Sequence, residues 1–207
     1  AIGDIVNSQP VYVGAPNPNQ FYTESFTGSN VFSTYASNNV NRAGAIYVAS
    51  NDGMLHAFNA STGAENFAYL PGAVITSGIS ALASVDYGGS VAHGFFNDGE
   101  LTVGDAYIGS TPGWKTVLVG TTGRGVAKTV YALDVTDPAD VKFLWERSAA
   151  DGKTDSNYIG QMTGKPVIAQ SANGTWAVLI GNGYNSAAGK SALLQFDLAD
   201  GTLHVHA

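Results

Sequence analysis

The sequence predicts an all-β fold, namely part of a β-propeller built from four-stranded antiparallel blades. Its composition favours strands joined by tight turns, because only 12% of the residues are charged while the chain has 26 glycines, ten tyrosines and nine phenylalanines. The chain also repeats one pattern three times, each time with four strand-like segments, and such repetition is typical of propellers. Glycine, asparagine, aspartate or proline bounds these segments, as turns between strands require.

The three passes of the pattern supply the predicted strands, each of which is alternating or continuously apolar. The strands are expected at residues 10–14, 46–50, 54–59 and 66–70, then at 101–108, 115–120, 129–134 and 141–146, and finally at 165–169, 176–181, 191–197 and 202–206. We therefore expect a single partial propeller domain over residues 1–207, with about three blades at residues 4–71 (blade A), 95–147 (blade B) and 159–206 (blade C).

The spacing between passes predicts two insertions. The pairs Phe58-Asn59, Leu133-Asp134 and Phe196-Asp197 mark the same point in each pass. The intervals between them are longer than the roughly 40 to 50 residues of a basic blade. We place the insertions at residues 16–41 and 71–99 and expect both to be loops on the rim.

A hairpin is predicted between the second and third strands of every pass. In the first pass Asp52-Gly53 favours a type I′ turn, while the later hairpins, at residues 121–128 and 182–190, are longer. No stretch predicts a long helix, and Ile79 to Val85 fits at most a short one.

Blades with two apolar faces must stack against one another around an axis, because neither face can be left in water. Closure of a propeller needs at least four blades. We therefore expect the predicted blades to be part of a larger propeller, with the others supplied by flanking sequence or by a partner.

Charge and cysteine content exclude several classes of partner. Nine Lys and Arg against sixteen Asp and Glu give a formal charge of −7, which opposes binding to nucleic acid or to anionic membranes. The absence of cysteine excludes disulfides and thiolate metal sites. The sequence has no long apolar stretch for a transmembrane segment, and no signal peptide is expected within these residues.

Several strings resemble one known family. Residues 46–63 look like the repeat of quinoprotein-type propellers. The strings Gly3–Gly14, Asp98–Tyr107, Val119–Gly125 and Gly160–Ile168, in this order, resemble the C-terminal propeller of the PilY/PilC family of type IV pilus tip proteins.

The resemblance implies a role in binding rather than catalysis. Members of this family sit at the pilus tip with minor pilins, promote pilus assembly by countering retraction, and contribute to adhesion and twitching motility. We therefore expect an exported protein at the bacterial cell surface, at the pilus tip or in the outer membrane, with an unidentified host or surface ligand.

Calcium is a further implication of the resemblance, since several members bind it in this domain through an Asp-rich loop similar to an EF-hand loop. Residues 151–155 hold only two acids with a lysine between them. We expect any calcium site to lie outside this segment and assign no metal ligand here.

Two glycine-rich hairpins invite a phosphate-loop interpretation, which their spacing does not support. A phosphate loop has four residues between its two glycines and a helix after it. Gly183 and Gly189 enclose five residues, and a predicted strand follows Lys190. The turn from Gly120 to Gly125 is followed by Val126 rather than lysine. Both are interpreted as hairpin loops.

The four histidines are interpreted as structural. His204 and His206 would share one face of a strand, but a pair is half a metal site. His56 lies within a strand and His93 in a rim loop, and neither has the neighbours expected of a catalytic base. No catalytic residue is assigned.

The alternative function is a quinone-dependent dehydrogenase or another propeller enzyme. Trp114, Trp145 and Trp176 invite a quinone- or sugar-stacking role, yet two lie within predicted strands and the third precedes one, which favours a place in the core. No PQQ is expected, since the cysteine pair of some quinone-binding propellers is absent. Such an enzyme would need acids, an arginine and a metal at the axis.

A third interpretation is a scaffold propeller with no role in pili.

The insertions are the predicted contact surfaces. Residues 17–41 are rich in Asn, Ser, Thr and aromatic residues, which suits an exposed binding loop, although a simple insertion has the same composition. The candidate ligand- or partner-binding residues are Phe21, Tyr22, Phe26, Tyr35 and Tyr87.

Overall fold

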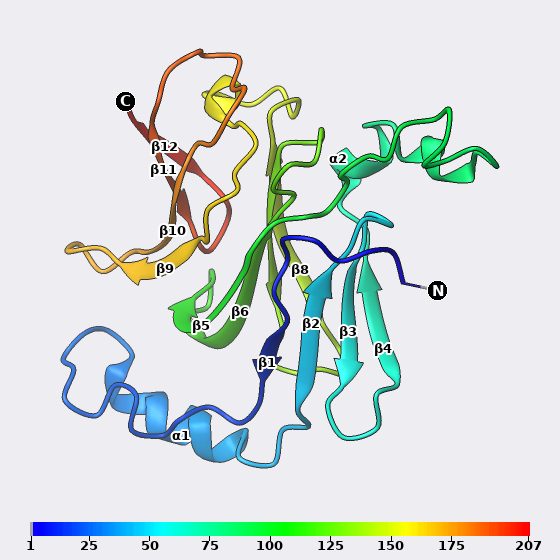
Figure 1. The fold of residues 1–207 in the computed structure, drawn as a ribbon. Helices are drawn as coiled ribbons and strands as arrows, with labels where there is room; N and C mark the ends of the chain where they lie inside the picture. The colour runs from blue at the N-terminus through cyan, green and yellow to red at the C-terminus, as the bar shows by residue number, and fades with distance from the viewer. Residues whose placement is uncertain (1) are drawn as a thin grey trace.

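A computed structural model describes residues 2–207 and contains three four-stranded antiparallel sheets, which lie side by side in Figure 1. Blade A consists of β1 (Val11–Val13), β2 (Ala45–Ala49), β3 (Leu55–Asn59) and β4 (Glu65–Tyr69). Blade B consists of β5 (Leu101–Ile108), β6 (Gly113–Thr121), β7 (Thr129–Asp134) and β8 (Lys142–Ser148). Blade C consists of β9 (Val167–Gln170), β10 (Trp176–Gly181), β11 (Leu193–Asp197) and β12 (Leu203–His206). The predicted all-β propeller fold is confirmed.

The first strand of each blade lies at the centre of the assembly. Within each sheet the strands follow chain order, so each pairs with the next along the chain. Strand β5 also contacts β1 on one side and β9 on the other. The three first strands therefore lie nearest the common axis, as the innermost strands of propeller blades do.

Blade B is apolar on both faces because it lies between the other two blades. Leu118 and Leu133 pack against Ala45, Tyr47 and other side chains of blade A. Val119 and Ala132, their neighbours in the chain, pack toward blade C. Every residue of β7 is buried, which explains why Val130–Leu133 form an unbroken run of apolar and aromatic residues where a half-exposed strand would alternate.

Trp145 of β8 joins blades B and C. Its ring stacks on Phe196 at a centroid separation of 5.8 Å, and its Nε1–H donates to the carbonyl oxygen of Leu198 at 2.9 Å. The predicted core position of the three tryptophans is confirmed, since Trp114, Trp145 and Trp176 are 8%, 4% and 8% exposed. Trp114 lies inside β6 rather than before it.

Glu146 joins blades A and B by hydrogen bonds. Its carboxylate accepts the hydroxyl of Tyr69 at 2.7 Å and the backbone N–H groups of Gly72 and Ala73 at 2.8 and 2.9 Å. Burial, together with the neighbouring Glu146 carboxylate, raises the pKa of Tyr69. The Glu146 carboxylate, which accepts three hydrogen bonds, thus connects the outer strands β4 and β8.

The turn between β2 and β3 differs from the predicted type I′ turn. Gly53 has φ 92°, but Asp52 is not among the residues with positive φ. Ser50 and Met54 pair, and the N–H of Gly53 donates to the Ser50 carbonyl oxygen at 3.0 Å. This pattern is a three-residue loop ending in a left-handed glycine. The Asp52 side chain stabilises it by accepting the N–H of Met54 at 3.0 Å.

The two insertions lie at opposite ends of the strands (Figure 1). The first contains η1 (Ser29–Val31) and α1 (Phe32–Asn38), and the second contains α2 (Gly72–Ile75) and η2 (Ile79–Ala83). Only the short helix at η2 was expected. A further turn, η3 (Ser156–Tyr158), lies between blades B and C. No helix within residues 2–207 has the length and apolar character needed to cross a bilayer.

The first insertion packs onto the core and is not a free rim loop. Phe32 is 1% exposed, and its ring meets Trp114 edge to face at 4.5 Å. The Nε1–H of Trp114 donates to the Gly28 carbonyl oxygen at 2.8 Å, and the Tyr35 hydroxyl bonds Thr116 at 2.7 Å. The aromatic residues that suggested an exposed surface mostly cover the end of the B–C interface.

Arg147 of β8 and Asp151, which follows β8, form a largely buried ion pair that we call the clamp. The carboxylate of Asp151 accepts Arg147 Nε at 2.7 Å, the Lys153 N–H at 2.8 Å and the Ser156 hydroxyl. Arg147 Nη1 also donates to the carbonyl oxygen of Gly201 in blade C at 2.9 Å. Burial alone would raise the pKa of Asp151, but the hydrogen bonds from Ser156, Arg147 and the backbone outweigh it and lower the pKa to about 2.

Replacing Trp145 tests the B–C interface. We expect Trp145→Ala to lower the free energy of unfolding by about 3–5 kcal/mol, since it removes a buried ring and leaves a cavity. Trp145→Phe keeps a ring and loses the hydrogen bond to Leu198, so its loss is expected to be smaller, about 1–3 kcal/mol. Urea unfolding of the intact protein measures both, and equal losses would contradict the described packing.

Asp151→Asn tests the clamp through its pH dependence. Because folding lowers the pKa from 3.8 to about 2, the stabilisation is complete above about pH 5 and is lost as the pH falls through about 2. We expect the variant to be less stable by about 1–3 kcal/mol at pH 7, with the difference vanishing near pH 2.

The control for this test is Asp140→Asn. It breaks the exposed pair of Asp140 with Lys142 and should change stability by less than about 1 kcal/mol at any pH. Unfolding curves at pH 7, 4 and 2.5 give the comparison, and a pH-independent effect of Asp151→Asn would contradict the clamp.

Candidate functional site

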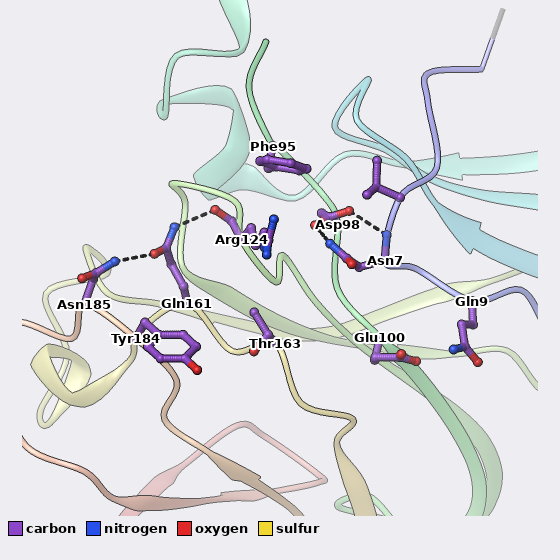
Figure 2. A pocket seen from close by; sticks show the side chains of 11 residues that line it. Asn7, Gln9, Phe95, Asp98, Glu100, Arg124, Gln161, Thr163, Tyr184 and Asn185 are labelled. Carbon is purple, nitrogen blue, oxygen red and sulfur yellow. Dashed lines mark hydrogen bonds between the residues drawn. The ribbon is translucent and has the colours of Figure 1, made fainter. Parts of the chain in front are cut away.

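A pocket of about 840 Å³ lies near the axis, at the end of the blades where the chain enters the first strands. We call it the axial pocket (Figure 2). The connectors before β1, β5 and β9 line it through residues 6–9, 95–100 and 161–163, and the hairpins of blades B and C add residue 124 and residues 184–185. All three blades contribute to its wall.

Each connector is bonded to the hairpin between the second and third strands of its own blade. In blade A the N–H of Asn51 donates to the Asp4 carbonyl oxygen at 2.9 Å. In blade C the N–H of Gly160 donates to the Asn182 carbonyl oxygen at 3.0 Å, and Gln161 and Tyr184 exchange two backbone bonds of 2.7 and 3.1 Å. Blade B repeats the contact through the N–H of Asp98 and the Thr122 carbonyl oxygen at 3.3 Å.

Glycine makes these contacts possible. A Cβ at Gly99 would overlap the backbone of Thr121, and a Cβ at Gly183 would overlap the carbonyl group of Gln161. Gly123 faces the backbone of Asp98 and Gly99 in the same way. Only residues without a side chain allow the connector and hairpin backbones to approach this closely.

Asp98 joins blades A and B inside the pocket. It is 2% exposed, and its two carboxylate oxygens accept the backbone N–H of Asn7 at 3.0 Å and the Asn7 side-chain amide at 2.5 Å. The charge of Asp98 is therefore used to position the connector of blade A. It is not free to act as a general base.

Gln161 joins blades B and C. Its side-chain Nε2–H donates to the backbone carbonyl oxygen of Arg124 at 2.6 Å, and its Oε1 accepts from Asn185 Nδ2 at 2.6 Å. Lys128 Nζ donates to the Asn185 carbonyl oxygen at 2.6 Å. Asn185 has φ 58°, a left-handed conformation that asparagine tolerates. These bonds fix both hairpins at the pocket wall.

Two charged side chains of the pocket remain available. The Arg124 guanidinium lies over the ring of Phe95, 5.5 Å from its centroid, in a cation–π contact. Glu100 lines the same pocket and lies to the lower right of Arg124 in Figure 2. Within residues 2–207 neither Arg124 nor Glu100 forms an ion pair.

The His, Asp and Glu side chains of the described residues do not gather in one cluster. Among residues 2–207 no three His, Cys, Asp or Glu side chains are placed to hold one ion. His56 contacts Asp52 at 2.9 Å through Nε2 and Glu65 at 2.5 Å through Nδ1, so its ring lies between the two carboxylates and keeps them apart. The axial pocket contains two acids, Asp98 and Glu100, and one arginine, Arg124.

The predicted contact residues do not gather in one place. Phe21, Phe26 and Tyr35 are partly buried against the core between blades B and C. Tyr87, from the other insertion, packs near Val74 and donates its hydroxyl to the Gly94 carbonyl oxygen at 3.2 Å. Tyr22 alone among the five is widely exposed, at 84%. That these residues bind a ligand stays a prediction.

The other histidines do not line the axial pocket. His93 contacts Asp4 at 3.1 Å on the surface. His204 and His206 are exposed on β12, and each bonds a residue of β11, Asp197 at 3.3 Å and Gln195 at 3.2 Å.

The pocket was not predicted from the sequence, although the four strings that carry the family resemblance form most of it. Gly3–Gly14 supplies Asn7 and Gln9, and Asp98–Tyr107 supplies Asp98 and Glu100. Val119–Gly125 supplies Arg124, and Gly160–Ile168 supplies Gln161 and Thr163. The family resemblance of these strings was the available signal, but nothing in the sequence indicated that they meet.

Comparison with known proteins gives one consistent answer. The family model described as the PilY1 beta-propeller domain matches residues 2–206. The chain is 46% identical over 200 residues to a type IV pilus biogenesis factor PilY1 homolog of Xylella fastidiosa strain Temecula1, covering 97% of this chain and 16% of that protein. It is 43% identical over 202 residues to type IV pilus biogenesis factor PilY1 of Pseudomonas aeruginosa strain UCBPP-PA14, covering 98% of this chain and 17% of that protein.

A solved structure agrees with the sequence comparisons. The crystal structure of the Pseudomonas aeruginosa PilY1 C-terminal domain is similar with a TM-score of 0.71 and 36% identity, covering 94% of this chain and 36% of that chain. The chain thus spans about a sixth of the length of the curated relatives it matches.

A pair of glycine substitutions tests the close contact in blade C. Gly183 and Gly189 lie in the same hairpin with φ of 72° and 63°, but only at Gly183 would an added Cβ have other atoms within 4 Å. We expect Gly189→Ala to lower the free energy of unfolding by about 1–2 kcal/mol through backbone strain alone. Gly183→Ala should lower the free energy of unfolding by about 1–3 kcal/mol more than Gly189→Ala does. The added Cβ would push Gln161 away, so the backbone bonds between Gln161 and Tyr184 would be lost as well. Equal effects in urea unfolding would contradict the close contact.

Proposed function

This chain belongs to the PilY1 β-propeller family, and on that basis we propose that it is the propeller part of a type IV pilus biogenesis factor that acts by binding. The match of the family model over residues 2–206 supports this proposal most strongly. The axial pocket is the surface through which we propose that it acts, because three blades hold that pocket in a fixed shape and leave charged groups available within it.

The non-enzymatic part of the proposal has two supports. The relatives are named as pilus biogenesis factors, which suggests a role in assembly. In the axial pocket both oxygens of the Asp98 carboxylate are bonded to Asn7, so this acid holds structure. A quinone-dependent dehydrogenase is not favoured by either observation.

The proposal includes finer assignments that the family resemblance implies. We place the protein at the cell surface, at the pilus tip or in the outer membrane, in contact with minor pilins. There it counters pilus retraction and contributes to adhesion and twitching motility. Any calcium site of the whole protein is assigned to sequence outside residues 2–207, and the remaining blades to flanking sequence.

An in-frame deletion of residues 2–206 tests the function. We expect cells carrying the deletion to have far fewer surface pili, measured by shearing the cells and blotting the major pilin, while total cellular pilin stays unchanged. Because the proposed role is to counter retraction, inactivating the retraction motor in the same strain should restore the pili.

The control is the intact gene returned to the deletion strain, which should restore surface pili without inactivating the motor. Normal piliation in the deletion strain, with the truncated protein present at the wild-type level, would contradict the proposal.

A further inference from the structure

We propose that the axial pocket binds an acidic saccharide, with Arg124 holding the carboxylate and Tyr184 providing the face on which the sugar ring stacks. The inference rests on the proposed function, since it names the ligand class of the same pocket. It goes beyond that function because pilus assembly by itself requires no sugar.

Arg124 indicates the carboxylate. Its guanidinium lies over Phe95 and forms no ion pair among the described residues, although the pocket contains two acids. The Asp98 oxygens are occupied by Asn7. An arginine held on an aromatic face presents its N–H groups in a fixed plane, and this geometry matches the two oxygens of a carboxylate.

The surrounding charge limits the ligand to a single negative group. The whole chain carries a formal charge of −7, and Glu100 lies in the same pocket. A polyanion such as a nucleic acid or a polyphosphate would be repelled. A molecule with one carboxylate on a neutral polar body meets Arg124 and avoids that repulsion.

The other lining side chains suit a hydroxylated body. Glu100, Gln9 and Thr163 supply acceptors and donors that take no part in the internal hydrogen bonds of the pocket wall, and hydroxyl groups pair with both kinds. Tyr184 is 69% exposed and offers a broad ring face. Aromatic rings with a polar edge pack well against the apolar face of a sugar ring while their hydroxyl stays wet.

The size of the pocket suits a saccharide. The pocket volume of about 840 Å³ lies within the range of small-molecule sites, about 300–1,000 Å³. Protein partners need about 800 Å² of contact on each side, spread over a broad surface.

The pocket wall is fixed before any ligand arrives. Gln161 bonds the Arg124 carbonyl oxygen and Asn185, and it pairs with Tyr184 through the backbone. The backbones of both residues assigned to the ligand are therefore held by one residue. A preformed site loses less conformational entropy on binding than a mobile one.

A matched pair of sugars tests the proposal on the intact protein. Methyl β-D-glucuronide and methyl β-D-glucoside differ only in a carboxylate replaced by a hydroxymethyl group, and calorimetry gives the affinity of each. We expect the glucuronide to bind at least about tenfold more tightly. Arg124→Gln should abolish this preference, and Arg124→Lys, which keeps the charge without the planar fork, should retain part of it.

Two further variants separate the roles. Tyr184→Ala should weaken both sugars about tenfold or more, while Tyr184→Phe, which keeps the ring, should bind both nearly as well as the wild type. Lys142→Gln removes the same charge as Arg124→Gln at the opposite end of blade B, and it should leave both affinities unchanged. Thermal unfolding of every variant shows that the fold is kept.

Three results would overturn the proposal: no difference between the two sugars, no effect of Arg124→Gln in a folded protein, or tighter binding of an acetylated peptide with a free carboxylate than of the glucuronide. If the deletion of residues 2–206 removes surface pili but the sugar preference is absent, only the saccharide inference fails. If piliation is unaffected by that deletion, the proposed function fails whatever the sugars do.

Discussion

Direct contact between each connector and the hairpin of its own blade is the constraint on which the axial pocket depends. The contact recurs in all three blades, at Asn51, at Thr122 and at Asn182. Two backbones can approach this closely only where one residue has no side chain, which explains glycine at positions 99 and 183. Once the hairpins are held against the connectors, the residues of three blades face one another across the axis.

Packing between blades turns this local contact into a rigid frame. Blade B has apolar residues on both faces, so it binds blade A through Leu118 and Leu133 and blade C through Val119 and Trp145. Carboxylates add directional bonds at the edges, Glu146 toward blade A and Asp151 with Arg147 toward blade C. Because the blades pack tightly on one another, the backbones of Arg124 and Tyr184 keep their places at the pocket wall.

The strands were predictable because their signals are local. Alternating or continuous apolar residues ending in turn residues place β5, β7 and β10 at the predicted bounds. The docking of the first insertion was not predictable, because Phe32 and Tyr35 look the same in sequence whether they face solvent or Trp114. The pocket was missed because its residues come from segments far apart in the chain. Those segments carry a family resemblance, but no local pattern in them indicates that they meet.

Amide hydrogen exchange of the intact protein tests the central claim most directly, namely that the connectors are fixed on the hairpins. The N–H groups of Gly160, Gln161 and Tyr184 lie outside regular strands but are bonded to carbonyl oxygens across the contact. They should exchange about as slowly as the amides of β10, since both require the same opening of blade C. Exchange at the rate of an unprotected loop would show that the connector is free and that the pocket is not preformed.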